Sequence, residues 1–168
     1  ATIFTGLYER THRFTFGTPP ISAADAAASY PAGLKRAEYR TGFVGKFGVQ
    51  IAPGRQKEMF DYFKPFGRGP YFKKRSDGSK WHVSQIAGDY AIEFLRDQKP
   101  GKPFCLSLSF NAPHAEDGDK KNHFPWPKAV DGLYRDVTIP APRLAEPSVF
   151  ESQPAFLKKS MNRSRWFW

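Results

Sequence analysis

Cysteine is almost missing from this chain: Cys105 is the single thiol among 168 residues. One thiol excludes an internal disulfide framework and any metal site that is built from several thiolates. Cys105 lies in the largely apolar stretch from Pro103 to Phe110. The sequence therefore predicts a buried thiol that acts as a small hydrophobic side chain.

Long hydrophobic runs are also missing. No segment approaches the roughly 20 apolar residues that cross a bilayer, and no charged-then-apolar leader opens the chain. We therefore expect no insertion into a membrane. The glycines do not match a Walker-type phosphate loop or a dinucleotide-binding turn, and there is no Cys-x-x-Cys pair or Gly-x-Ser-x-Gly elbow.

Positive charge, in contrast, is abundant. The chain has 26 Lys and Arg against 16 Asp and Glu, which gives a formal net charge of +10. Such a charge raises the concentration of anions near the protein. A nucleic acid, an anionic membrane face and a sulfated polysaccharide are all compatible with it, and charge alone does not choose among them.

The distribution of apolar residues predicts a globular α/β unit. The chain is 40% hydrophobic and 16% aromatic, which is enough for one sizeable core. Apolar residues recur at helical spacing from Ser84 to Gln98, which predicts an amphipathic helix. Large and small side chains alternate from Phe104 to Phe110, which predicts a strand, and a shorter strand is expected from Tyr39 to Val44. Ligands of parallel sheets bind at the carboxyl ends of such strands.

The segment from Ala52 to Lys80 is rich in glycine, proline, cations and aromatic residues. We expect it to be an irregular region that covers a substrate cleft. Its aromatic residues are Phe60, Tyr62, Phe63, Phe66, Tyr71 and Phe72.

Three segments carry a family resemblance: Ala1–Gly6 (ATIFTG), Gly42–Gly48 (GFVGKFG) and Phe110–His114 (FNAPH). Each is weak alone, but together and in this order they resemble the front half of the sulfatase family. The resemblance implies an alkaline-phosphatase-like α/β fold with a mostly parallel sheet flanked by helices. It also implies that residues 1–168 form an internal part of an N-terminal catalytic domain.

The resemblance further implies that the nucleophile lies outside this sequence. In the family, the motif ending in ATIFTG begins with Cys-x-Pro-Ser-Arg, and its cysteine is oxidised to formylglycine, which attacks the sulfate ester. The chain begins at Ala1 and ends in the aromatic run Arg165–Trp168, so we expect a piece of a longer sulfatase that is truncated at both ends. This piece alone is expected to be inactive.

The resemblance assigns two catalytic and substrate-binding residues. Lys46 matches the family lysine that contacts the sulfate, and His114 matches the histidine near the ester oxygen. An ammonium group suits the nonbridging sulfate oxygens, and an imidazole suits protonation of the leaving alcohol. The other histidines are not assigned: we expect His12 to be structural, and His82 and His123 to lie on the surface or in loops.

No metal ligand is expected within the chain. Sulfatases hold a divalent cation, usually Ca²⁺, through residues that would all lie outside this sequence. The loop with Glu116, Asp117 and Asp119 is rich in oxygen ligands, but its spacing matches no complete calcium loop. We interpret it as a solvated acidic turn.

Two positions depart from the family pattern. Phe47-Gly48 follows Lys46 where the family most often has Trp-His, so the histidine that bonds the formylglycine is missing. Glu38 stands where the family helix usually ends in a left-handed glycine. A left-handed glutamate is predicted to be strained by about 1 kcal/mol.

The resemblance thus favours a sulfuric ester hydrolase of the sulfatase or arylsulfatase type that acts on sulfated carbohydrates. It also implies an extracellular or periplasmic location, which is common in the family. A phosphodiesterase-type relative of the same superfamily is one alternative, and it would have Thr or Ser as its upstream nucleophile. A non-enzymatic module that binds polyanions through the aromatic segment Phe60–Phe72 is the other, since stacking and cationic contacts combine there. Nucleic acid is not the expected partner.

Overall fold

The computed structural model describes residues 1–15 and 19–160. The C-terminal run Arg165–Trp168 lies outside the described residues. The chain divides into two units, Ala1–Asp131 and Gly132–Trp168, and each is considered by itself. The assignment of both units to one catalytic domain stays a prediction.

The first unit begins with four short helices, and strands and further helices follow. In chain order they are α1 (Thr2–Thr5), α2 (Glu9–His12), α3 (Ala23–Ala28), α4 (Tyr30–Arg36), β1 (Arg40–Lys46), α5 (Gln56–Met59), β2 (Tyr62–Phe66), β3 (Phe72–Lys74), β4 (Lys80–His82), α6 (Val83–Arg96), β5 (Phe104–Ser109) and the 3₁₀ turn η1 (Lys128–Val130).

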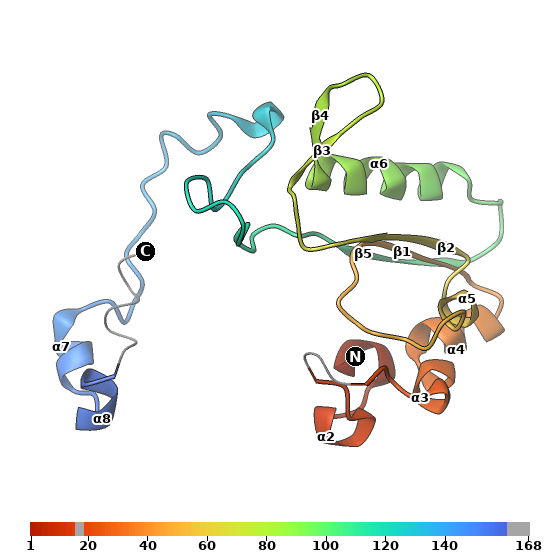
Figure 1. The fold of residues 1–168 in the computed structure, drawn as a ribbon, viewed down its shortest axis with the longest axis horizontal. Helices are drawn as coiled ribbons and strands as arrows, with labels where there is room; N and C mark the ends of the chain where they lie inside the picture. Colours follow the sequence, from red (N-terminus) through yellow and green to blue (C-terminus); the bar gives the residue numbers. More distant parts are fainter. Residues whose placement is uncertain (16–18, 161–168) are drawn as a thin grey trace. The chain divides into compact units, whose positions relative to one another are not determined.

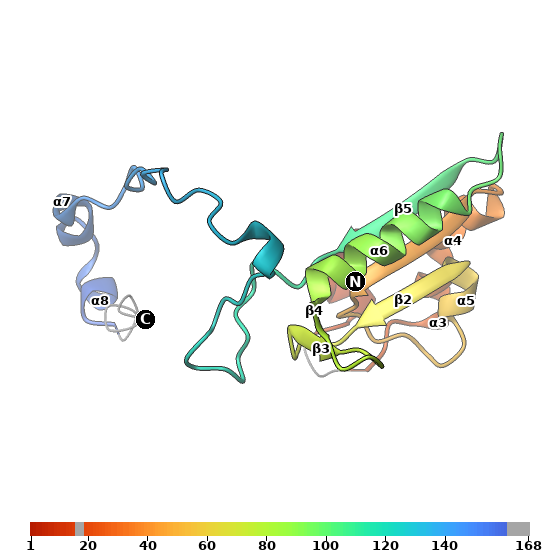
Figure 2. The same ribbon diagram turned by 90° about the horizontal axis from the view of Figure 1, so that it is seen from above.

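A parallel sheet with the strand order β2-β1-β5 forms the centre of this unit. Helix α6 covers one face of the sheet, and the N-terminal helices lie on the other face (Figure 1). Figure 2, which looks down on α6, shows this helix running along the strands. The strands β3 and β4 form a separate antiparallel hairpin that leads directly into α6.

Aromatic side chains make up most of the core between the sheet and the N-terminal helices. Phe43 of β1 packs edge-on against Phe47, with the ring centroids 4.8 Å apart, and Phe4 of α1 lies 6.0 Å from Phe43. Phe60 and Phe63 complete the cluster as a stacked pair, 5.5 Å apart. These contacts fix α1 against the end of β1, where the site residues lie.

Close packing on the opposite face requires a glycine. A Cβ atom on Gly42 of β1 would lie 2.7 Å from the ring of Phe94 in α6. Phe94 is fully buried, and the guanidinium of Arg40 lies 4.5 Å from the centre of its ring. Arg40 and the open side of Gly42 therefore face α6, whereas Phe43 faces the N-terminal helices.

The structure confirms the amphipathic helix and both predicted strands. Ser22 caps α3 by accepting a 3.0 Å hydrogen bond from the backbone N–H of Asp25. The prediction of an irregular region from Ala52 to Lys80 is wrong, because this segment contains α5, β2 and β3. Phe60 and Tyr71 of that region are buried, so burial of its aromatic residues orders the segment.

Glu38 has the left-handed conformation that the sequence predicts, with φ of +66°. It follows α4, and the N–H of Tyr39 donates to the carbonyl of Leu34 across the helix end. We expect Glu38→Gly to raise the free energy of unfolding by about 1 kcal/mol, because glycine adopts this conformation without a Cβ penalty. Urea denaturation measures the difference. Glu38→Ala is the matched control: it keeps the Cβ, so equal stabilisation by alanine would contradict the backbone explanation.

The described part of the second unit, residues 132–160, contains two short helices, α7 (Pro147–Glu151) and α8 (Ala155–Lys158). The proline-rich stretch from Ile139 to Pro142 has no regular structure, as expected where proline removes backbone donors. Among the described residues, no helix is long and apolar enough to span a bilayer.

Candidate active site

Lys46 is the last residue of β1, at the carboxyl edge of the sheet. Strand alternation would place it on the α6 face with Gly42. It instead lines a cavity of about 650 Å³ together with Ala1, Thr2 and Phe4 from the N-terminal segment. Lys46 is therefore next to the first residues of the chain, although 45 positions separate Ala1 from it in sequence.

Gly45 explains this departure from regular alternation. Its φ is +111°, a conformation that L side chains rarely adopt. The backbone of Ser109 in β5 passes directly over the position that a Cβ of Gly45 would occupy. The glycine thus allows β5 to approach and changes the direction of the chain just before Lys46.

A second cavity, of about 370 Å³, lies beside the first. It shares Lys46, Ala1 and Thr2 with the first cavity, and its lining also includes His12 and Gly48. A Cβ on Gly48 would meet no atom within 4 Å. Gly48, where this chain departs from the family pattern, therefore leaves open space beside Lys46.

His114 lies on the loop that follows β5, five residues after Ser109. The backbone N–H of His114 donates to the carbonyl of Asn111, and the ring Nδ1 is 2.6 Å from the carbonyl oxygen of Ala115. Because a carbonyl oxygen only accepts, Nδ1 carries the hydrogen in this contact. Proton exchange with a substrate would therefore use Nε2, and the side chain is exposed.

Polar contacts with the buried Tyr71 hold the His114 loop in place. Tyr71 is almost fully buried, and its hydroxyl donates to the carbonyl oxygen of His114. The carboxylate of Glu116 accepts a hydrogen bond from the N–H of Tyr71. Burial, followed by the carboxylates of Glu116 and Asp117, raises the pKa of Tyr71, so its hydroxyl remains a donor. These contacts tie the loop to the segment before β3.

Asn111 fastens the same loop at its start. Its side-chain amide donates two 2.9 Å hydrogen bonds, to the carbonyl oxygens of Gly67 and Arg68. Arg68 in turn forms an ion pair with Asp117 at 2.9 Å. The loop that carries His114 is thus anchored at both ends.

The structure brings Lys46 and His114 to the same edge of the sheet. β1 and β5 are neighbouring parallel strands, and Gly45 pairs with Ser109, so both chains leave the sheet on the same side. Their surroundings differ, because Lys46 lines the two cavities and His114 is exposed on its loop. Joint contact with one substrate stays a prediction.

His12 has the structural role that the sequence predicts. It is buried, its Nδ1 accepts a 3.0 Å hydrogen bond from the N–H of Phe14, and its Nε2 is 3.0 Å from the hydroxyl of Thr2. With Nδ1 accepting, Nε2 is the nitrogen that carries the hydrogen. His12 therefore fixes α2 against α1.

The expectation that His82 lies on the surface or in a loop is wrong. His82 is buried at the N-cap of α6, where its Nδ1 accepts from the N–H of Ser84. Its Nε2 lies 3.0 Å from the carbonyl oxygen of Pro125, and burial lowers the pKa of His82. Gln85, three residues after the cap, completes a capping box. A capping box usually begins with Ser or Thr, so Gln85 was the one part of this pattern that the sequence offered.

Cys105 does not have the surroundings of a reactive nucleophile. It lies in β5 and is half-buried, and burial raises the pKa of its thiol. A raised pKa leaves less of the nucleophilic thiolate at neutral pH. The burial predicted from the sequence is therefore only partial, although a small apolar role is compatible with this position.

The acidic loop makes contacts within the protein. Glu116 and Asp117 hold the His114 loop as described above, and the carboxylate of Asp119 accepts hydrogen bonds from the N–H groups of Lys121 and Asn122. Within residues 1–15 and 19–160, no three or more His, Cys, Asp or Glu side chains are grouped to hold a metal ion. The residues in these two ranges therefore do not fit a calcium site.

The sequence matches one protein-family model, described as Sulfatase, over residues 1–135. It is 26% identical over 153 residues to an N-acetylglucosamine-6-O-sulfatase of Bacteroides thetaiotaomicron, an alignment that covers 84% of this chain and 25% of the relative. It is 29% identical over 138 residues to the extracellular sulfatase SULF-1 homolog of Drosophila melanogaster, covering 70% of this chain and 12% of the relative. The chain thus spans a quarter or less of these curated relatives.

Two solved structures have a similar fold. One is a protein in complex with its substrate D-glucosamine-2-N,6-O-disulfate, with a TM-score of 0.59 and 25% identity, covering 86% of this chain and 28% of that one. The other is a complex with a neocarrahexaose, with a TM-score of 0.56 and 19% identity, covering 68% of this chain and 34% of that one. The second similarity concerns the fold alone.

Proposed function

Because this chain belongs to the sulfatase family, we propose that the protein hydrolyses sulfate esters of carbohydrates. The observation that carries the proposal is the position of Lys46, at the carboxyl end of β1 and in one cavity with the ATIFTG segment. The family resemblance places the attacking group just before that segment. The lysine and the expected attacker would then face the same small volume.

The family and the α/β fold expected from the sequence are both confirmed. The family model matches most of the chain, and the solved sulfated-sugar complex has the same architecture over 86% of it. The central sheet is parallel and has helices on both faces. This framework brings the ends of β1 and β5 to one edge, where α/β sheets bind their ligands.

In the proposed reaction, Lys46 neutralises charge on the sulfate. A sulfate monoester is anionic before reaction, and negative charge also develops on the leaving alcohol oxygen. An ammonium group fixed at the end of a strand can contact nonbridging oxygens without reorganising. Lys46 is half-buried, so its charge is less screened than that of a fully exposed lysine.

His114 has the complementary role of proton donor to the leaving oxygen. Its Nδ1 is engaged by the carbonyl of Ala115, which orients the ring and leaves Nε2 for the substrate. A carbohydrate alkoxide is a poor leaving group, so protonation as the ester bond breaks lowers the barrier. The anchored loop supplies the orientation that such a transfer requires.

A formylglycine nucleophile and a calcium ion complete the proposal by family resemblance. Formylglycine would supply the hydrated aldehyde that attacks sulfur, and calcium would balance the anionic charge. The described part of the chain contains no grouped metal ligands, and Cys105 lacks the Cys-x-Pro-Ser-Arg context. Neither group is therefore assigned to a described residue.

Two names support a sulfated sugar as the substrate. One relative is an N-acetylglucosamine-6-O-sulfatase, and the similar structure holds a glucosamine disulfate. We also propose that the protein acts outside the cytoplasm, as the resemblance implies; a relative described as extracellular supports this.

Replacing Lys46 with glutamine tests the proposed function. We expect kcat/KM for a sulfated monosaccharide to fall roughly 100-fold, since a charge that contacts the reacting group is lost while most of the side-chain volume remains. Sulfate release by the full-length enzyme is the measurement. Lys57→Gln, at an exposed position in α5, is the matched control. Equal rates for the two variants would remove Lys46 from the mechanism.

A further inference from the structure

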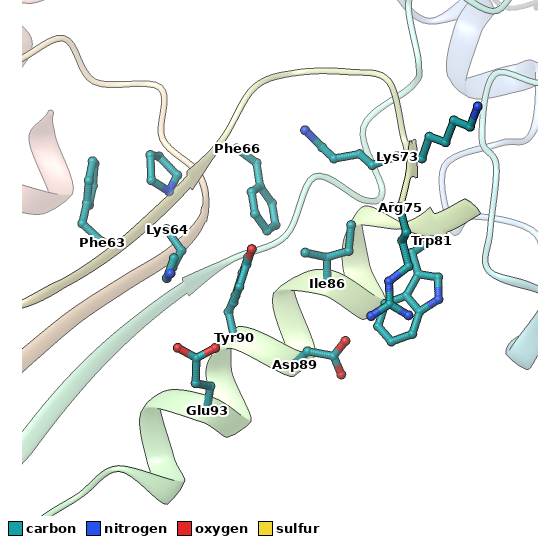
Figure 3. A pocket seen from close by; sticks show the side chains of 12 residues that line it. Phe63, Lys64, Phe66, Lys73, Arg75, Trp81, Ile86, Asp89, Tyr90 and Glu93 are labelled. Carbon is teal, nitrogen blue, oxygen red and sulfur yellow. The ribbon is translucent and has the colours of Figure 1, made fainter. Parts of the chain in front are cut away.

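A cleft of about 570 Å³ lies between β2, the β3–β4 hairpin and α6 (Figure 3). It is on the α6 side of the sheet, and none of its lining residues lines the two cavities around Lys46. Four of its lining residues are cations, and four are aromatic: Lys64, Lys73, Lys74 and Arg75, with Phe63, Phe66, Trp81 and Tyr90.

Aromatic rings orient three of the cations. The guanidinium of Arg75 is 3.7 Å from the centre of the Trp81 ring system. The ammonium of Lys64 lies 5.0 Å from the ring centre of Tyr90, and that of Lys73 lies 5.7 Å from the ring centre of Phe66. Cation–π contacts of this kind restrict the long side chains but leave their charges uncompensated.

The four cations also form no direct ion pair in the described part of the chain. Across residues 1–15 and 19–160, no ion pair includes Lys64, Lys73, Lys74 or Arg75. In the β3–β4 hairpin, Lys74 pairs in register with Lys80, which adds a fifth positive charge at the rim. Because the cations outnumber the two carboxylates that line the cleft, the cleft keeps a net positive charge, which favours the binding of an anion.

Two carboxylates distinguish this cleft from a purely basic patch. Asp89 and Glu93 lie on α6, one turn apart, and Figure 3 shows both side chains projecting from this helix; both are exposed. A nucleic-acid backbone carries an anion at every nucleotide and would be repelled by them. A sulfated oligosaccharide has spaced anionic groups between hydroxyls, and hydroxyls donate hydrogen bonds to carboxylates.

We propose that this cleft is a second binding site for sulfated oligosaccharides, separate from the Lys46 site. The ligand class rests on the proposed function. Sulfate groups contact the lysines and Arg75, hydroxyls contact Asp89 and Glu93, and the rings of Phe66, Trp81 and Tyr90 pack against the apolar faces of the sugar rings. A polymer held here would stay bound while its sulfate esters react at the opposite face.

The proposed site differs from the polyanion-binding surface that the sequence suggested, which was the aromatic segment Phe60–Phe72. Phe60 and Tyr71 of the segment Phe60–Phe72 are buried, so stacking on the whole segment is excluded. Phe66 lines the cleft, and Trp81 joins it from β4, outside that segment. The structure therefore assigns the binding surface to side chains from β2, β3, β4 and α6.

Direct binding of a heparin-derived hexasaccharide tests the proposal. All proteins carry Lys46→Gln, which weakens the contribution of the active site. We expect Lys64→Gln combined with Lys73→Gln to weaken binding roughly tenfold or more, since two charge-assisted contacts are lost. The matched control combines Lys99→Gln with Lys120→Gln, two exposed lysines outside the cleft. Equal affinities for the two double variants would overturn the proposal.

Two further ligands sharpen the result. The desulfated hexasaccharide should bind at least tenfold more weakly than the sulfated one, because it lacks the anions. Single-stranded DNA of equal charge should also bind more weakly, and equal or tighter binding of DNA would overturn the choice of ligand. With Lys46 restored, Lys64→Gln and Lys73→Gln should leave hydrolysis of a sulfated monosaccharide unchanged.

The two proposals fail separately in this design. Binding is measured without turnover, so an enzyme that releases no sulfate but still binds through Lys64 and Lys73 would refute the proposed function alone. An enzyme that hydrolyses the monosaccharide but binds the hexasaccharide equally well without those lysines would refute the second site alone.

Discussion

Gly45→Ala is expected to prevent the protein from folding. The new Cβ would lie 1.8 Å from the carbonyl oxygen of Ser109 and 2.7 Å from its carbonyl carbon, both of which are backbone atoms of the neighbouring strand. No side-chain rotation relieves such a contact, so β1 and β5 would have to separate. The φ of +111° adds strain of its own. We expect a loss of more than about 4 kcal/mol.

Soluble yield and the midpoint of urea denaturation measure this effect. Gly48→Ala is the matched control three residues further on, where a Cβ meets no atom within 4 Å. Its stability should stay within about 0.5 kcal/mol of the original protein. An unchanged denaturation midpoint for Gly45→Ala would show that β5 does not approach β1 as described.

His114→Ala is expected to lower kcat for a sulfated sugar by about 1,000-fold, because the leaving alkoxide would no longer receive a proton. The loss should be much smaller for 4-nitrophenyl sulfate, whose phenolate leaves without protonation. The ratio of the two losses distinguishes proton donation from a general loss of structure. A structural role would reduce both rates equally.

Steady-state kinetics on both substrates measure the ratio, and the control is His123→Ala, at another loop histidine. Tyr71→Phe provides a graded test of positioning. It removes the hydroxyl that donates to the His114 carbonyl but keeps the buried ring. It should reduce the sugar reaction more than the nitrophenyl reaction, and in the same direction as His114→Ala.

The sequence predicted the parts of the fold that local pattern determines. Helix α6 and strand β5 carry their periodicity within a few neighbouring residues, and both are confirmed. Strand β2 was missed because Lys64 and Pro65 are more typical of a loop. It is a strand because pairing with β1 and packing of Phe63 against Phe60 outweigh those local preferences.

The candidate site also has parts that the sequence could predict and parts that it could not. The end of β1 and the loop after β5 could be expected at one edge, since neighbouring parallel strands end together. The cavity lined by Lys46, Ala1 and Thr2 could not be predicted, because it depends on the positive φ of Gly45 and on tertiary contacts of α1. The cleft on the α6 face likewise combines β2 with a hairpin and a helix that no short motif connects.

The strand order β2-β1-β5 has a consequence during synthesis on the ribosome. β1 is made first and lies in the middle, so it can pair with β2 on one side as soon as both have emerged. Its other edge must wait until α6 and β5 have been translated, which takes a few seconds at roughly 5–20 residues per second. During that interval the nascent chain exposes an open hydrogen-bonding edge, and chaperones have most reason to bind it then.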